Sequence, residues 1–546
     1  MFYNRKEDIV SDAIDALVAA SGGRLVRFEA KEHARVVLRA DWDRSKVAIV
    51  SGGGSGHEPS HAGLVGKGLL TAAVCGEVFA SPSVDAVLAA IVAVTGEAGC
   101  LLVVKNYTGD RLNFGLAAER ARAMGLSVEM VIVADDIAIP DAARPRGVAG
   151  TIFVHKIAGH MAEAGAGLKA IKAAAEAAMR GLFSVGVARD SCTVPGSPKV
   201  SRIGAGEVEI GLGIHGEPGV DLARLTDASG LVADLVTRLA PHVKPGAAYA
   251  MLFNNLGGLA NLECMVLLAD ILRSSLAPSL RFLAGPSGVM TALDMPGFSI
   301  SLLELTPEHE VMLLSPTDCP ALPPFRPVGA ITAIAAPVTI ETTPTPSRDD
   351  AVRRVVETII ATCAGMEHDI NALDARVGDG DTGSTFATGA RAVEAALDRL
   401  PFADGAALLA ALSDIKRKAM GGSSGVLFAI MLARAGEAYR DEGDWARALA
   451  AGLQAMQLYG GASPGDRTMI DALRPALDAL VAGASLSAAA VAARRGADST
   501  AGMLRANAGR SAYLEARSLE GIKDPGAEAV ARILEALAGG RGPSLP

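Results

Sequence analysis

The sequence predicts a chain of two structural halves, an α/β half followed by an all-α half. In the first part, short runs of Val, Ile and Leu alternate with Ala-rich helical patterns, as in α/β domains. In the last part, strand signals nearly vanish and one amphipathic helix follows another. A segment rich in Pro and Thr separates them, which is typical of a linker. We therefore expect domains at 1–332 and 348–546, joined by a linker at 333–347.

Composition narrows the class of protein. The chain has 546 residues, of which half are hydrophobic and 4% aromatic, as in a helix-rich or α/β enzyme. A net charge of −9 without a long basic run argues against nucleic acid as the partner. The N-terminus has no apolar core of a signal peptide, and no stretch is long and apolar enough to span a membrane. The six scattered cysteines favour reduced thiols, so we expect a cytoplasmic protein.

The first candidate site follows a short apolar run at 46–50, which predicts a buried strand. This strand opens into a glycine-rich loop at 51–59 that contains His57. The spacing of the glycines does not match a dinucleotide-binding loop, and Lys67 lacks the Ser or Thr of a Walker loop. Since open α/β sheets bind ligands at the carboxyl ends of their strands, we expect a site for a small polar ligand here.

A second predicted strand, at 100–105, ends in Lys105. The following loop carries Asp110 before a helix that we expect to begin near Asn113. Taken singly, such residues are more often structural than catalytic, but two strand-end loops now carry chemically active side chains. The similar acidic turn at 135–136 is interpreted as structural.

A second α/β subdomain is predicted at about 185–332, after a first at about 1–184. Within it, His215 stands in a glycine-lined turn that follows a strand-like run. A lone histidine is usually structural. The flanking glycines, however, remove side chains that would shield the imidazole, so an accessible nucleophile is a plausible alternative.

The all-α half begins with an amphipathic helix whose apolar stripe runs from Val352 to Leu373 and delivers Asp374. Asp379 and Asp381 follow, and intervening glycines let the backbone bring them back towards Asp374. Converging carboxylates without His or Cys suit Mg²⁺. The next residues resemble a helix start whose free N–H groups attract anions. A solvated turn remains the alternative, whereas an EF-hand fails because its later ligand positions are Gly and Ala.

Seven ordered motifs, spread over essentially the whole chain, resemble the single-chain ATP-dependent dihydroxyacetone kinases. Those resembling the ketone-binding half are Gly52–Pro59, Lys105–Asp110 and Gly213–Gly219. Those resembling the nucleotide-binding half are Asp374–Gly383, Gly421–Gly425, Gly465–Met469 and Gly509–Tyr513. The resemblance implies an α/β ketone-binding half of two subdomains and an all-α antiparallel helix-barrel nucleotide-binding domain.

The resemblance also implies roles in the ketone half. His215 would bond covalently to the substrate carbonyl as a hemiaminal. The backbone at Gly54 and the side chains of His57, Lys105 and Asp110 would hydrogen-bond the substrate's hydroxyls, with Asp110 taking the proton from the attacking one.

In the other half, the resemblance implies that Asp374, Asp379 and Asp381 hold two Mg²⁺ ions on ATP. The nucleotide would contact ten further residues: Gly421, Gly422, Ser423, Ser424, Gly425, Arg467, Thr468, Met469, Thr382 and Ser384. A homodimer is also implied, with the barrel of one half meeting the ketone pocket of another.

The function implied is transfer of the γ-phosphate of ATP to a primary hydroxyl of dihydroxyacetone. Erythrulose or glyceraldehyde are alternative substrates, because a hemiaminal requires only an accessible carbonyl. A non-catalytic carbonyl-binding regulator is a further alternative that the aspartate triad disfavours. An FMN-cyclase side activity is expected less than either.

Overall fold

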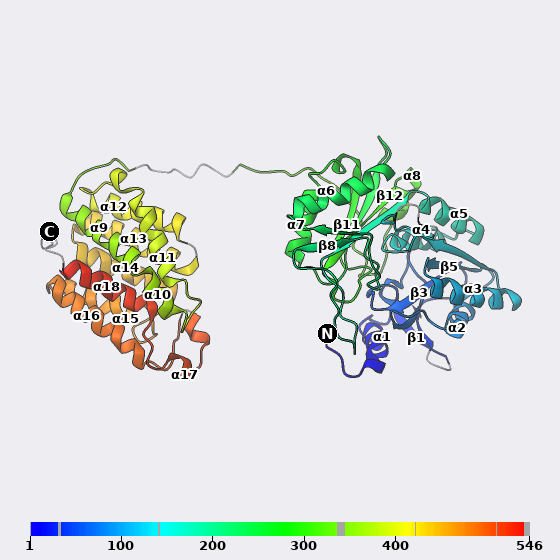
Figure 1. Cartoon of the computed structure of the whole chain (residues 1–546), viewed down its shortest axis with the longest axis horizontal. Coiled ribbons are helices and arrows are strands. Elements are labelled where there is room, and N and C mark those ends of the chain that lie inside the picture. Colours follow the sequence, from blue (N-terminus) through cyan, green and yellow to red (C-terminus); the bar gives the residue numbers. More distant parts are fainter. Residues whose placement is uncertain are drawn as a thin grey trace. The chain divides into compact units, whose positions relative to one another are not determined.

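The computed structural model describes residues 2–30, 34–139, 142, 144–335, 344–420, 422–508 and 510–539 (Figure 1). The chain divides into two compact units, Met1–Ala333 and Ile334–Pro546. Much of the expected linker, residues 336–343, lies outside the described residues. Among the helices that are described, none combines the length and hydropathy needed to cross a membrane.

The first unit begins with a six-stranded sheet of order β1-β2-β4-β3-β5-β6. Strands β4, β3, β5 and β6 are parallel, whereas β1 and β2 pair antiparallel at one edge. Apolar residues on both sides of β3 and β5 are buried, as expected for central parallel strands. The bounds are β1 Leu25–Ala30, β2 Ala34–Arg39, β3 Ala48–Ser55, β4 Ala72–Val78, β5 Cys100–Lys105 and β6 Val128–Val133.

Helices cover both faces of this sheet. Side chains of α2 and α3 pack on one face, and those of α1, α4 and α5 on the other. The bounds are α1 Ile9–Ala19, α2 Val84–Val94, α3 Thr108–Ala123, α4 Thr151–Glu163 and α5 Leu168–Met179.

The second sheet has the order β13-β11-β10-β12-β7-β8-β9 and is mixed. Helices α6 and α7 pack on one face, while residues of the other face, such as Leu252 and Phe282, join the core of the first sheet. The two sheets therefore share one hydrophobic core. The bounds are β7 Leu182–Ala188, β8 Glu207–Ile210, β9 Asp221–Arg224, α6 Ala228–Leu239, β10 Tyr249–Asn255, α7 Asn261–Ile271, β11 Leu280–Ser287, β12 Gly297–Glu304, α8 Pro307–Leu314 and β13 Arg326–Pro327.

The second unit is helical, and its helices contact one another in a closed ring. The ring runs α9-α11-α12-α13-α14-α15-α16-α18, and α18 returns to α9. This arrangement agrees with the predicted all-α barrel. The bounds are α9 Asp350–Gly365, α10 Glu367–Asp374, α11 Thr382–Glu394, α12 Gly405–Ala419, α13 Gly422–Glu442, α14 Trp445–Gly460, α15 Ile470–Val481, α16 Leu486–Ser499, α17 Ala516–Leu519 and α18 Pro525–Gly539.

Three expected boundaries are wrong. The strand at 46–50 continues to Ser55, so much of the glycine loop is strand, because backbone pairing with β4 continues past Gly52. The helix expected near Asn113 already begins at Thr108, which places Asp110 in its first turn. The single helix expected before Asp374 ends at Gly365, and a second helix, α10, carries Asp374.

Candidate active site

The first unit brings two predicted histidines into contact, although 158 positions separate them. The turn after β3 carries His57, and the turn after β8 carries His215. Their Nε2 atoms lie 3.1 Å apart. His57 Nδ1 lies 2.7 Å from the carbonyl oxygen of Thr291, so Nδ1 carries a proton that it donates. Burial lowers the pKa of His57 well below its ordinary value, which favours the neutral ring.

Glu217 orients His215. Its Oε1 lies 2.9 Å from His215 Nδ1, and its Oε2 accepts a hydrogen bond of 3.0 Å from the backbone N–H of His215. Burial acts to raise the pKa of Glu217, but the hydrogen bonds from His215 outweigh it and hold the pKa at about 2. An ionised Glu217 keeps the proton of neutral His215 on Nδ1, so the lone pair lies on Nε2.

Arg146 connects the turn that carries His215 to Asp136 by hydrogen bonds. Its Nε donates to Asp136 at 2.7 Å, and its Nη2 donates to the carbonyl oxygen of Gly211 at 2.6 Å. A Cβ at residue 213 would lie 1.9 Å from Glu217 Oε2, so Gly213 leaves the space that the carboxylate occupies.

Two aromatic rings form walls around the histidines. The ring of Phe79 stacks on His57 and meets His215 edge-on, with centroids 5.2 Å away in both cases. Tyr107 meets His215 edge-on at 4.7 Å. Phe79 has φ +59°, which is strained for an aromatic residue and typical of functional sites. Its backbone also packs on Gly54, where a Cβ would lie 2.7 Å from the N atom of Ala80.

Lys105 and Asp110 lie beside the same loop. A Cβ at Gly53 would lie 3.1 Å from Lys105 Nζ and 3.3 Å from Asp110 Oδ2. Ser81 Oγ donates to the other carboxylate oxygen of Asp110. Lys105 is fully buried, and its Nζ has no hydrogen-bond partner. Burial lowers the pKa of Lys105, and the negative charge of Asp110 opposes this shift. A buried donor without an acceptor indicates a ligand-binding position.

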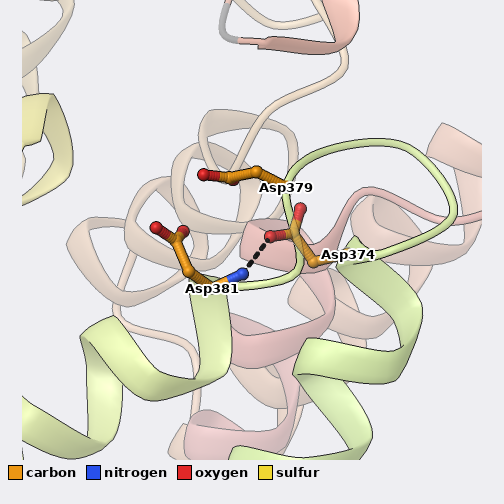
Figure 2. A group of neighbouring side chains, drawn as sticks. All are labelled: Asp374, Asp379 and Asp381. Carbon is orange, nitrogen blue, oxygen red and sulfur yellow. Dashed lines mark hydrogen bonds between the residues drawn. The ribbon is translucent and has the colours of Figure 1, made fainter. Parts of the chain in front are cut away.

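The second unit gathers the three predicted aspartates (Figure 2). Asp374 ends α10, and Asp379 and Asp381 lie on the loop to α11; one oxygen of each lies within 4.8 Å of the others. Gly380 has φ +79°, a conformation that glycine adopts readily, and it turns the loop back. Asp381 N donates to Asp374 Oδ2 at 3.0 Å. Three convergent carboxylates, two of them exposed, fit a hard divalent cation.

The expectation of free N–H groups at the start of α11 is wrong for two of its first residues. Thr382 N donates to Asp374 Oδ2 at 3.1 Å, and Ser384 N donates to Asn371 Oδ1 at 3.0 Å. Asn371 Nδ2 also donates to Ser384 Oγ at 2.8 Å. Side chains of α10 thus hold this turn, because α10 and α11 pack against each other.

Arg467 is the largest fully buried side chain among the described residues. Its Nη2 donates to the carbonyl oxygen of Ile522 at 2.8 Å, but Nε and Nη1 have no partner. Its φ is +61°, again in the left-handed region. The nearby Asp524 is buried, which raises its pKa to about 7, while Arg467 opposes this rise and Asp374 adds to it. An arginine with unused donors near the aspartates suits a phosphate group.

The other predicted nucleotide contacts divide into three groups. Gly421 lies outside the described residues, and so do the side chains at 422 and 423. Ser424 and Gly425 lie in the first turns of α13, where a Cβ at Gly425 would meet the carbonyl oxygen of Met420 at 2.4 Å. Thr468 N donates to Asp471 at 2.8 Å, and Met469 packs in two hydrophobic clusters.

Sequence reasoning missed Glu217, Phe79, Tyr107 and Asp524. Glu217 stands only two residues after His215, so a carboxylate next to a candidate nucleophile was an available signal. Tyr107 stands between Lys105 and Asp110, but only the fold brings its ring against His215. Phe79 and Asp524 carry no local signal, since only the fold brings them to the predicted residues.

Two family models and several known proteins match this chain. Residues 16–321 match the Dak1 domain, and residues 376–539 match the DAK2 domain. The dihydroxyacetone kinase of Citrobacter freundii is 47% identical over 98% of each chain, and the human triokinase/FMN cyclase is 41% identical over 96% of each. The crystal structure of the Citrobacter freundii kinase in complex with AMP-PNP and Mg²⁺ has a TM-score of 0.80, 45% identity, and covers 98% of this chain and 99% of that chain. The chain therefore belongs to the single-chain dihydroxyacetone kinase family.

Proposed function

We propose that this protein transfers the γ-phosphate of ATP to a primary hydroxyl of dihydroxyacetone while His215 holds the ketone covalently. The observation that carries the proposal is the His57–His215 pair, with Nε2 atoms 3.1 Å apart, beside the unpartnered Nζ of Lys105. Full-length similarity to a dihydroxyacetone kinase supports the same substrate.

The covalent step balances with one proton from solvent. The Nε2 lone pair of His215 attacks the carbonyl carbon, and the π electrons of the C=O bond move to oxygen. A solvent proton neutralises that oxygen, and the ring of His215 keeps its Nδ1 proton and becomes positively charged. Glu217, which remains ionised, offsets the positive charge that develops on the His215 ring. Tethering restricts the motion of the substrate and favours in-line attack.

The hydroxyl groups of the substrate would bind beside the loop that contains Gly53 and Gly54. Lys105 Nζ donates to a substrate hydroxyl, which supplies the acceptor that this buried ammonium lacks. Asp110 Oδ2, on the side opposite its bond from Ser81, accepts the proton of the attacking hydroxyl. The backbone at Gly54 binds the same substrate.

In the helical unit, Asp374, Asp379 and Asp381 would hold Mg²⁺, which we propose as two ions on ATP. Bound Mg²⁺ offsets phosphate charge during transfer. Arg467 supplies unused donors for a phosphate oxygen. We further propose that the protein is a cytoplasmic homodimer. In this dimer, the nucleotide-binding barrel of one subunit would meet the ketone pocket of the other.

The covalent link is tested by ¹³C NMR with dihydroxyacetone labelled at its carbonyl carbon. Protein binding is expected to move the signal from the ketone region to that of a carbon with four single bonds, and His215→Ala is expected to abolish the shift. A bound ketone that keeps its carbonyl signal beside an intact His215 would refute the hemiaminal.

Erythrulose and glyceraldehyde remain candidate substrates of the same site, since the human relative is a triokinase/FMN cyclase. ATP turnover with dihydroxyacetone, both erythruloses, glyceraldehyde and glycerol separates these activities. A carbonyl-binding regulator is disfavoured because it has no use for the aspartates at 374–381.

A further inference from the structure

A cavity of about 310 Å³ lies in the first unit beside α4, between α8 and the segment that follows it. Its walls combine polar and apolar surface. The apolar side chains include Leu313, Pro316, Cys319, Leu322, Pro323 and Phe325. None of these side chains belongs to the proposed ketone site.

Lys156 of α4 reaches this cavity and is buried, with 1% of its surface exposed. Its Nζ donates to the carbonyl oxygen of Met312 at 2.9 Å and to Ser315 Oγ at 2.5 Å. An ammonium group has three protons, so these acceptors leave one proton for another partner. Burial lowers the pKa of Lys156 to about 8, so the group is still mostly charged at neutral pH.

No acidic side chain among the described residues balances this charge. The buried arginines of the same unit are paired, Arg39 with Asp41 and Glu163, and Arg146 with Asp136. Buried Lys105 makes no hydrogen bond, but it has the negative charge of Asp110 nearby. The bonds of Lys156 to the end of α8 make it a helix C-terminal cap. Such a cap stabilises a helix only weakly, and this contribution is smaller than the cost of burying an unpaired charge.

We propose that this cavity binds a small monocarboxylate with an apolar body. The carboxylate would take the remaining proton of Lys156, and the hydroxyl of Thr317, which also lines the cavity, is a further donor. The Ser315 hydroxyl gives its proton to the carbonyl oxygen of Met312. The apolar walls would contact an aliphatic body of a few carbons. A phosphate dianion fits less well, because one ammonium and one hydroxyl satisfy few of its oxygens.

The cavity is linked to the segment that follows the proposed ketone loop. Cys319 Sγ donates to the carbonyl oxygen of Gly63 at 2.8 Å, and its neighbour Asp318 accepts at Oδ1 from Lys67 N at 2.6 Å. On α4, His155 lies next to Lys156 and contacts Ser51 Oγ at 3.1 Å. We therefore expect an occupied cavity to change the KM for the ketone. The binding site itself does not depend on the proposed kinase activity.

Isothermal titration of the full chain with isovalerate tests the site, with isoamyl alcohol as the uncharged counterpart. We expect saturable binding of isovalerate with a Kd of about 1 mM or tighter, and binding of the alcohol at least about tenfold weaker. Lys156→Met is expected to weaken isovalerate binding at least about tenfold. Lys169→Met, which removes an exposed lysine on the neighbouring α5, serves as the matched control and is expected to bind normally.

A second variant, Leu322→Trp, fills the cavity and leaves the ammonium in place. It keeps the test decisive if Lys156→Met does not fold, and it is expected to abolish binding. Equal affinity in the wild type and in either folded variant would overturn the proposal. Absence of saturable binding to the wild type at about 20 mM isovalerate would overturn it as well.

Discussion

Glu217→Gln tests how the proposed nucleophile is oriented. The substitution keeps the size of the side chain and one oxygen acceptor, but it removes the negative charge opposite His215 Nδ1. The structure gives this carboxylate two contacts with His215, at 2.9 and 3.0 Å. Hydrogen bonds to charged groups contribute about 1.5–3 kcal/mol each. Loss of one such interaction lowers kcat/KM for the ketone about 10- to 150-fold.

The assay is release of ADP at varied ketone and ATP concentrations, repeated between about pH 5 and 9. The effect is expected in kcat/KM for the ketone, while KM for ATP stays unchanged. The loss is expected over this whole range, because the pKa of Glu217 is lowered to about 2 and its carboxylate stays ionised throughout. Glu176→Gln, on the exposed side of α5, is the matched control.

A Glu217→Gln enzyme with unchanged kcat/KM for the ketone throughout this pH range would refute this reasoning. A loss confined to kcat, with KM for the ketone unchanged, would assign Glu217 a merely structural role.

Further predictions concern both units. Asp381→Asn is expected to lower turnover about 10³-fold at saturating Mg²⁺ without unfolding the chain, and near-normal turnover would remove it from the metal site. His215→Ala is expected to raise KM for the ketone and spare ATP binding measured by calorimetry; glycerol, which lacks a carbonyl, should be a poor substrate of the wild type. Residues 1–332 alone are expected to bind ketone without ATP turnover, and 348–546 to bind nucleotide only; ketone phosphorylation by the first fragment would contradict the assignment. Because the pKa of Glu217 is lowered to about 2 from 4.5, its contribution to stability is present above pH 4.5 and is lost as pH falls towards 2, so acid titration of Glu217→Gln should show less destabilisation in this window.

The fold class could be predicted because both of its signals are periodic. Short Val, Ile and Leu runs predicted β3 and β5, and apolar steps of three and four predicted the helices of the second unit. Element boundaries were harder, because they depend on pairing and capping. Strand β3 continues to Ser55 because β4 pairs with it. The residues of β3 alone do not indicate where this pairing ends.

The sequence by itself determined the aspartate cluster, since three carboxylates and a turning Gly380 within eight positions are brought together by local backbone geometry alone. It also marked His57 and His215 as separate candidates. Only the tertiary structure decided that these histidines touch, because the turns after β3 and β8 belong to different sheets joined by a shared core. The same holds for Lys156, whose unpaired charge exists only because α4 packs against the end of α8.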